Sequence, residues 1–363
     1  MFDYLIVGSG FFGSVFANQV KKNGKSVLIL EKRNHIGGNC FTENIDGIPI
    51  HKYGAHIFHT SDINIWNFVN MFCKFNSYQH HVIANYKNEY YSLPFNMWTF
   101  NKMWGVNTPK DAIKIINEQK FIGTPKNFEE QALQIVGRDI YERLIKGYTK
   151  KHWRIDPVEL SVDIIKRLPV RFTFNNNYYF DKYQGIPENG YTELFEKMLM
   201  DIEVKLNTDY FVDKSHWDSI AKRIVYTGPI DKFYNYKYGK LDYLTLRFEN
   251  KNVYEDNYQG HSVINFTDES IPYTRIIEHK HFYENRRTNN SIITYEYSDQ
   301  WTVDKEPYYP INNVSNMNTY NLYKKDMELE SKFIFGGRLA EYKYYDMHQV
   351  IASALHKSKL ELL

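Results

Sequence analysis

The fold is decided by the stretch YLIVGSGFFG at residues 4–13. Four consecutive apolar residues are typical of a buried parallel strand, and the glycines behind them have the spacing Gly-x-Gly-x-x-Gly. A helical pattern follows over residues 14–22, and a second apolar strand over residues 27–30 ends at Glu31. Such a unit binds dinucleotides, because the helix N-terminus attracts the pyrophosphate and the acidic residue accepts a hydrogen bond from a ribose. We therefore expect cofactor contacts from Gly8, Gly10, Phe12, Gly13 and Glu31.

The residues after Glu31 favour FAD over NAD as the dinucleotide. A glycine pair at residues 37–38 lets the backbone approach the rest of the cofactor, and this segment resembles the corresponding segment of flavoproteins. A second glycine pair at residues 336–337 precedes the last predicted helix, whose N-terminus would stabilise an anionic reduced flavin. Further cofactor contacts are expected from Lys32, Gly38, Asn39, Arg338, the N-cap residue Asp346, and Met347.

Length and composition indicate an ordinary globular protein. The 363 residues suggest about two or three domains, and a net charge of +2 gives no reason to expect a nucleic-acid partner. The 31 Tyr, 24 Phe and 6 Trp suit a wet cleft in which rings stack and hydroxyls bond. Two cysteines, Cys40 and Cys73, exclude a disulfide framework. No apolar run has the length of a membrane span and no signal-peptide layout is visible, so we expect a cytoplasmic protein.

Three patterns follow one another along the rest of the chain. A helical pattern covers about residues 61–155, with an apolar stripe every four residues from Phe128 that ends at Gly147. Short strands rich in β-branched and aromatic residues then predict an antiparallel sheet at residues 243–248, 262–266 and 291–295. The chain ends in a strand, a glycine turn and an amphipathic helix over residues 333–362.

These patterns predict an α/β protein with a Rossmann-like FAD-binding domain, an inserted helical domain and an antiparallel β-sheet substrate domain. Both chain ends and a middle segment would build the FAD-binding domain, at residues 1–72, 187–228 and 330–363. The helical domain is expected at residues 73–155, and the sheet domain at residues 156–186 and 229–329.

Two histidines, His56 and His59, lie three residues apart and raise the question of a metal site. On a strand they would face opposite sides, and no neighbouring carboxylate completes a set of ligands. We therefore expect no metal. Both residues could serve as structural histidines, and a contact with flavin or substrate is the favoured interpretation.

Four short segments combine basic and aromatic side chains, at residues 148–153, 166–171, 272–275 and 307–310. Arginine forks bind phosphate oxygens, and Tyr and Trp rings stack on a planar base. Together the segments predict a site for a phosphorylated ligand that carries a base. For any one segment alone, surface arginines and core aromatics are an equally good explanation.

A series of ordered segments matches one enzyme family: residues 8–13, 35–39, 53–60, 93–97, 146–149, 166–171, 183–187, 272–282, 308–310, 337–339 and 342–347. On these segments the chain resembles the bacterial UDP-galactopyranose mutases over essentially its whole length. Several ordered segments of this kind are more specific than any single motif.

The resemblance implies a mutase that interconverts UDP-galactopyranose and UDP-galactofuranose for cell-surface polysaccharide biosynthesis, without net redox change. It implies FAD in its reduced form, whose N5 attacks the anomeric carbon and forms a covalent flavin–sugar intermediate. It also implies a nucleotide-sugar substrate, an external reductant such as NAD(P)H, and a homodimer.

By matched position, the resemblance assigns two arginines to the diphosphate: Arg167 on a mobile loop and Arg275 fixed opposite it. Two converging guanidinium groups would stabilise both the departure and the retention of a dianionic leaving group. The other assigned substrate contacts are Tyr148, Trp153, Tyr178, Tyr309, Tyr344, His59 and His80, and the residues placed beside the flavin are His56, Arg338, Tyr344 and Asp346.

Three departures from the family pattern concern the sugar more than the flavin. Arg154 follows Trp153 where the family often has glycine, and Leu244 stands where an arginine is common. Arg247 would face the other side of that strand. His80 stands where many relatives have an asparagine. The alternatives are therefore the same chemistry on an N-acetylated, 6-deoxy or pentose nucleotide sugar, an amine-oxidase-type FAD oxidoreductase, or a non-catalytic flavoprotein.

Overall fold

The first parallel strand pair lies where the sequence predicts it. In the computed structural model, which describes residues 1–165, 169–283 and 288–363, β1 (Phe2–Val7) pairs in parallel with β2 (Val27–Leu30). Three more strands complete a five-stranded parallel sheet in the order β16-β10-β1-β2-β9: β9 (Glu203–Lys205), β10 (Ala221–Tyr226) and β16 (Phe333–Phe335). Strands from the start, middle and end of the chain thus build one sheet, which confirms the predicted Rossmann-like fold.

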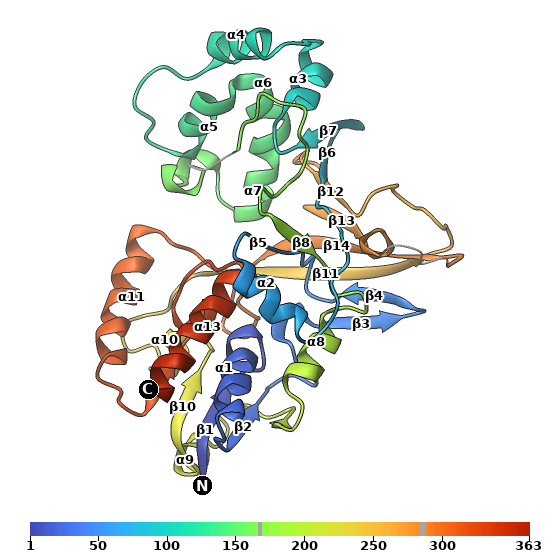
Figure 1. Cartoon of the computed structure of the whole chain (residues 1–363). Coiled ribbons are helices and arrows are strands. Elements are labelled where there is room, and N and C mark those ends of the chain that lie inside the picture. The colour runs from blue at the N-terminus through green and yellow to red at the C-terminus, as the bar shows by residue number, and fades with distance from the viewer. Residues whose placement is uncertain (166–168, 284–287) are drawn as a thin grey trace.

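Helices cover both faces of this sheet, so its strands are buried on both sides. Tyr4 and Ile6 of β1 belong to the core under α1 (Phe11–Lys22), whereas Leu5 belongs to the core on the opposite face. On the first face, α1 packs against α13 (Met347–Leu362) and α8 (Tyr191–Met198), so the N-terminal and C-terminal helices lie side by side (Figure 1). The opposite core includes Tyr323 of α11 (Val314–Met327).

The second sheet has seven strands in the order β15-β11-β14-β13-β12-β6-β7. It confirms the expected antiparallel sheet, although β12 pairs in parallel with β6. Its strands are β6 (Val82–Tyr86), β7 (Glu89–Leu93), β11 (Tyr243–Val253), β12 (Val263–Phe266), β13 (Arg275–Glu278), β14 (Ser291–Gln300) and β15 (Tyr309–Pro310). In Figure 1 this sheet lies between the parallel sheet and the upper helices.

The expectation of a helical pattern over residues 61–155 is wrong in part, because β6 and β7 form a hairpin within this range. Its turn residues Lys87 and Asn88 have φ angles of +50° and +66°, as a two-residue hairpin turn requires. The sequence analysis missed this turn because neither residue is glycine. The division into domains remains a proposal, in which the helical part begins at Met97 and not at residue 73.

The upper helices of Figure 1 form a separate apolar core. They are α3 (Met97–Trp104), α4 (Pro109–Gln119), α5 (Phe128–Val136), α6 (Arg138–Ile140), a π-helical turn at Tyr141–Lys146, and α7 (Gly147–Trp153). The predicted stripe from Phe128 is buried. The expectation that Gly147 ends it is wrong, because the break falls at Gly137, where φ is +77°, and Gly147 is the first residue of α7.

Shorter elements connect these three parts. They are β3 (Thr42–Ile45), β4 (Ile48–His51), β5 (Phe58–Thr60), β8 (Tyr183–Gly185), α2 (Ile63–Asn70), α9 (Lys214–Ser219), α10 (Ile230–Phe233), α12 (Gly337–Ala340), and the 3₁₀ turns Gly38–Cys40, Pro157–Glu159, Val162–Ile164 and His279–Phe282. Within the described ranges, every helix is too short or too polar to cross a membrane.

Replacement of Gly147 by alanine should destabilise the protein, although helix propensity alone predicts that it would stabilise α7. A Cβ at this position would lie 2.4 Å from the carbonyl oxygen of Thr267, on the sheet that α7 packs against. Alanine normally stabilises a helix by about 1 kcal/mol relative to glycine, but the overlap with backbone should cost about 2 kcal/mol. Gly147→Ala should therefore lower the Tm in thermal unfolding. Lys114→Ala on the exposed face of α4 is the control and should leave the Tm nearly unchanged. A higher Tm for Gly147→Ala would contradict the close packing.

Candidate functional site

A first cavity of about 290 Å³ lies at the carboxyl end of β1, where the sequence predicts the dinucleotide. It is lined by all but two of the residues assigned to the cofactor: Gly8, Gly10, Phe12, Gly13, Glu31, Lys32, Gly38, Asn39, His56, Arg338 and Met347. Tyr344 and Asp346 line a neighbouring cavity instead. The fold thus brings the predicted cofactor residues together in one cavity, although they lie up to 339 positions apart in the chain.

The geometry of this cradle fits a pyrophosphate-linked cofactor. Gly8 has a φ of +104°, and a Cβ there would lie 2.3 Å from the hydroxyl of Thr227. No side chain caps the N-terminus of α1 at Gly10, which leaves its first amide groups available to phosphate. The buried Glu31 carboxylate accepts hydrogen bonds from the amide and hydroxyl of Ser9, at 3.0 and 2.7 Å, and so fixes the turn at the ribose end.

A second cavity of about 530 Å³ lies between the seven-stranded sheet, α7 and the start of α13. The assigned substrate residues that line it are His59, His80, Tyr148, Tyr178, Arg275, Tyr309 and Tyr344. Its lining shares His56, Arg338 and Met347 with the first cavity. The two cavities therefore meet at these three side chains, and a planar ring of a cofactor in the first cavity would be exposed there to a ligand in the second.

Arg275 lies at the start of β13 with its guanidinium held from two sides. Its Nε lies 2.9 Å from a carboxylate oxygen of Glu296, and its Nη2 donates to the hydroxyl of Tyr148 at 2.9 Å. Burial alone would lower the pKa of Arg275, but the adjacent Glu296 carboxylate raises it above its usual value. The arginine is thus a permanently charged, preorganised donor in the cavity wall.

The sequence analysis missed Glu296, which is almost fully buried and lies directly opposite Arg275 in the β13–β14 register. The available signal was an acidic residue between two tyrosines, Tyr295 and Tyr297, in the predicted strand that begins at Ser291. A buried carboxylate needs a partner, and its partner is the arginine assigned to phosphate.

Tyr309 and Tyr344 lie together as the sequence implied. Their rings stack at a centroid distance of 5.2 Å, and the guanidinium carbon of Arg338 lies 4.8 Å from the centre of the Tyr309 ring. Arg338 also donates to the carbonyl oxygens of Tyr308 and Tyr345, at 3.2 and 2.6 Å. One arginine therefore holds both tyrosine segments at the junction of the two cavities.

His56 has a fixed tautomer at that junction. Its Nδ1 lies 2.7 Å from the carbonyl oxygen of Gly54 and must donate to it, which leaves Nε2 as an acceptor. Burial lowers the pKa of His56 to about 4, so the ring is neutral near pH 7. Its backbone is held on both sides, because the amide donates to His51 Nδ1 at 3.0 Å and the carbonyl accepts from the Tyr191 hydroxyl at 3.1 Å.

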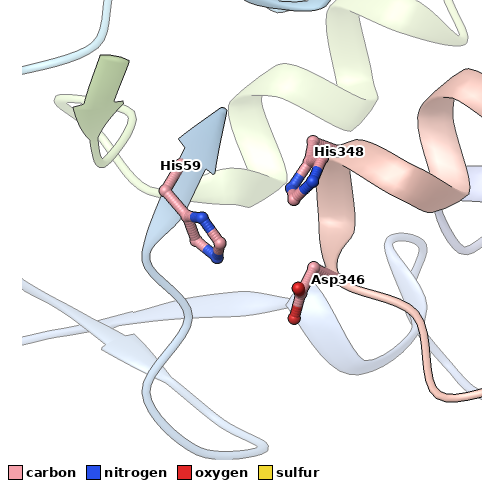
Figure 2. A group of neighbouring side chains, drawn as sticks. All are labelled: His59, Asp346 and His348. Carbon is pink, nitrogen blue, oxygen red and sulfur yellow. The ribbon is translucent and has the colours of Figure 1, made fainter. Parts of the chain in front are cut away.

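His59 and His80 both have ring contacts with the tyrosine pair Tyr178–Tyr179. Burial lowers the pKa of His80 to about 3, with Arg275 adding to the effect, so this ring is neutral too. The His59 ring stacks on Tyr179 at 3.8 Å and its Nδ1 bonds to Asp181 at 2.6 Å. Figure 2 shows His59 pointing towards Asp346 and His348 at the start of α13, a grouping that the sequence did not reveal.

Among the described residues, one assigned substrate residue does not line the cavity. Trp153 packs against the helical core and does not line the second cavity. Arg154, which follows it, has a φ of +57°, a conformation that glycine adopts more readily. Arg167 lies outside the described residues.

Comparison with known proteins gives consistent results. A family model described as UDP-galactopyranose mutase matches residues 143–344, and a model of an NAD(P)-binding Rossmann-like domain matches residues 6–72. The dTDP-fucopyranose mutase of Escherichia coli is 39% identical over 366 residues, covering 98% of this chain and 97% of the relative. A probable UDP-galactopyranose mutase of Klebsiella pneumoniae is 39% identical over 358 residues, covering 97% and 92%.

Among solved structures, a crystal structure of reduced UDP-galactopyranose mutase superposes with a TM-score of 0.78 at 12% identity, covering 100% of this chain and 94% of the other. At that identity the structural likeness supports the fold.

The buried histidines predict that acid destabilises the protein well above the usual carboxylate range. Burial lowers the pKa values of His56 and His152 to about 4 and those of His80 and His279 to about 3, below their unfolded value of about 6.5. The unfolded state then binds more protons below pH 6.5, so stability is lost as pH falls from about 6.5 towards 4. The Tm of the FAD-bound protein should therefore fall over this range. His80→Gln should flatten the dependence, whereas His216→Gln on the exposed face of α9 should not. An unchanged Tm between pH 7 and 5 would contradict the neutral, buried state.

Proposed function

The chain belongs to the UDP-galactopyranose mutase family, and we propose that it interconverts the pyranose and furanose forms of UDP-galactose. The observation that supports this most is the position of Arg275, a preorganised cation in the wall of the cavity that adjoins the cofactor cradle. A sugar joined to a diphosphate needs both features, because its phosphates must be held while its anomeric carbon faces the cofactor.

The cofactor of this mutase is FAD. Reduced FAD supplies the nucleophile for a ring interconversion that has no net redox change. The residues that would hold it are those lining the first cavity, with the α1 N-terminus at the pyrophosphate and Glu31 at the ribose. His56, Arg338 and Met347 would surround the ring system, where the two cavities meet.

The diphosphate of the substrate would bind between Arg275 and the stacked tyrosines. Glu296 and Tyr148 hold the guanidinium in place before a ligand arrives, so little side-chain entropy is lost on binding. Tyr309 and Tyr344 line the same cavity with hydroxyl groups that can donate to phosphate oxygens. Tyr178 lies at the same wall, where its backbone amide donates to the carbonyl of His80 at 2.7 Å.

We propose Arg167 as the second cation at the diphosphate. Ile165 and Pro169, which flank the undescribed residues 166–168, both line the second cavity. Further along, Arg171 is buried and donates to the carbonyl oxygens of Asn177 and Tyr178, and its guanidinium stacks on Phe180. Arg171 therefore holds its own segment against the cavity and is not itself available as the second phosphate ligand.

One alternative sugar and base have specific support. The relative that acts on dTDP-fucopyranose is as similar as the one named for UDP-galactopyranose. Leu244 pairs with Tyr309 across β11 and β15, so an arginine at that position would have stood beside the diphosphate. Arg247 does not replace it, since it bonds to Glu249 and stacks on Tyr297 at the exposed side of β11. A 6-deoxy sugar on dTDP is therefore the second candidate.

The assigned histidines would act on the substrate as neutral rings. His80 offers an imidazole whose Nδ1 lies 3.2 Å from the Tyr78 hydroxyl, and Tyr78 in turn lies 2.5 Å from the hydroxyl of Ser262. This network fixes the orientation of the His80 ring in the cavity wall.

We also propose that NAD(P)H is the external reductant and that the enzyme is a homodimer. An amine-oxidase-type activity is not supported, because the family is one of mutases.

Arg275 provides the first test. Arg275→Ala should leave FAD binding intact and lower kcat/KM of the reduced enzyme by roughly 30- to 1000-fold, because a charge-assisted contact to phosphate is worth about 2–4 kcal/mol in the transition state. Arg275→Lys should recover part of the loss, since lysine keeps the charge but not the fork. Arg247→Ala is the matched control on the exposed side of the same sheet and should be close to wild type. Near wild-type turnover of Arg275→Ala would exclude the proposed diphosphate site.

The substrate is tested with a panel of nucleotide sugars and dithionite-reduced enzyme. UDP-galactofuranose and dTDP-fucofuranose should be compared by kcat/KM for conversion to the pyranose, and one of the two should exceed all N-acetylated and pentose analogues. Oxidised enzyme should be nearly inactive, with no reductant consumed per turnover of the reduced form. Equal activity in both redox states would exclude the proposed role of the flavin. A preference for dTDP-fucofuranose would exclude UDP-galactose as the main substrate but not the reaction class.

A further inference from the structure

Three side chains from distant parts of the chain converge on one small space beside the second cavity. His59 comes from β5, and Asp346 and His348 come from the start of α13 (Figure 2). One ligand atom of each lies within 4.8 Å of the others. His59 and Asp346 also line the second cavity, so the group forms part of the wall that faces the substrate.

The bond between His59 and Asp181 prepares His59 as a ligand. Its Nδ1 lies 2.6 Å from Oδ2 of Asp181, and the hydroxyl of Ser61 donates to the other carboxylate oxygen at 2.7 Å. When Nδ1 donates to a carboxylate, Nε2 keeps its lone pair, and the same arrangement orients most metal-binding histidines. The stacking of the ring on Tyr179 at 3.8 Å restricts its rotation further.

The second histidine contributes a nitrogen without a partner. Nδ1 of His348 is buried and forms no hydrogen bond within the part of the chain that is described. The His348 ring meets the His59 ring edge-on at 5.2 Å. A buried nitrogen without a partner is unfavourable, and a bound cation would satisfy it.

We propose that His59, Asp346 and His348 form a binding site for a divalent transition metal ion, with Zn²⁺ as the representative ion. Two imidazole nitrogens and one carboxylate oxygen are the donor set of many three-ligand zinc sites, in which water occupies the fourth position. Imidazole donors disfavour Mg²⁺ and Ca²⁺, which prefer oxygen ligands. The negative charges of Asp346 and Asp181 offset the charge of the ion.

Ion binding requires only a small closure of the three side chains. Tetrahedral ligands at about 2.1 Å from zinc lie about 3.4 Å apart, so ligand atoms that now lie within 4.8 Å of one another must approach by up to about 1.4 Å. Rotation of the Asp346 and His348 side chains at the start of α13, both only partly buried, would bring them towards His59, whose ring is held in place. A bound ion would withdraw His59 and Asp346 from the cavity that receives the sugar. Zinc is therefore an inhibitory ligand of this site.

The test uses the FAD-bound enzyme without an affinity tag, dialysed against chelator and then against chelator-free buffer. Isothermal titration calorimetry with ZnCl₂ should show one equivalent bound, and MgCl₂ should show none. His348→Ala should abolish this binding, and Asp181→Asn should weaken it about 10- to 100-fold. His356→Ala is the matched control, because His356 is an exposed histidine on the same helix, and it should bind like wild type.

Activity provides the second readout. Zn²⁺ should inhibit the reduced wild-type enzyme and His356→Ala over the concentrations at which it binds, and inhibit His348→Ala only at concentrations at least tenfold higher. FAD absorbance checks that His348→Ala is folded, and His348→Gln serves if it is not. Absence of one-equivalent binding, or equal binding by His348→Ala and wild type, would overturn the proposal. Because calorimetry does not depend on turnover, failure of the mutase assignment would leave this result unaffected.

Discussion

The site depends on the close packing of the Phe12 ring against the backbone at Gly336. A Cβ at Gly336 would lie 1.9 Å from a carbon of that ring, so no other residue fits there without displacing α1. Phe12 lies within the glycine motif, in the first turn of α1, and Gly336 begins the segment that carries Arg338, Tyr344 and Asp346. This contact is part of the packing of α1 against α12 and α13, which holds the C-terminal segment against the N-terminal cradle.

Arg338 connects this C-terminal segment to the residues that line the second cavity. It donates to the carbonyl oxygens of Tyr308 and Tyr345 and lies over the Tyr309 ring, so three segments converge on one guanidinium. Charged hydrogen bonds to backbone oxygens are among the stronger polar interactions in a partly buried setting. The position of the stacked tyrosines is therefore a consequence of the cofactor domain, although Tyr309 belongs to the seven-stranded sheet.

The parts of the structure that follow from local sequence could be predicted, and the parts that depend on distant contacts could not. The glycine motif, Glu31 and the capped C-terminal helix each carry their signal within about 30 residues. The β6–β7 hairpin was missed because Lys87 and Asn88 adopt positive φ angles without a glycine to mark them. The role of Gly147 was misread, because its glycine is required by the carbonyl of Thr267, which is far away in sequence. The sequence analysis considered only the pair of His56 and His59 and found no neighbouring carboxylate, whereas the fold places Asp346 and His348 from the other end of the chain beside His59.

The charge balance at the diphosphate leads to a last inference about how the site works. Glu296 offsets the charge of Arg275, Arg171 is tied to the carbonyl oxygens of its own segment, and the arginine common at Leu244 is absent. Arg338, the other described arginine in this cavity, lies over the Tyr309 ring and is bound to two backbone carbonyl oxygens, so Arg275 and Arg338 are both held in place by protein groups before a ligand binds. A dianion withdrawn from water needs compensating charge as well as hydrogen bonds. Ile165 and Pro169, the described residues nearest to Arg167 in the sequence, both line the cavity, so we infer that Arg167 supplies further positive charge beside Arg275.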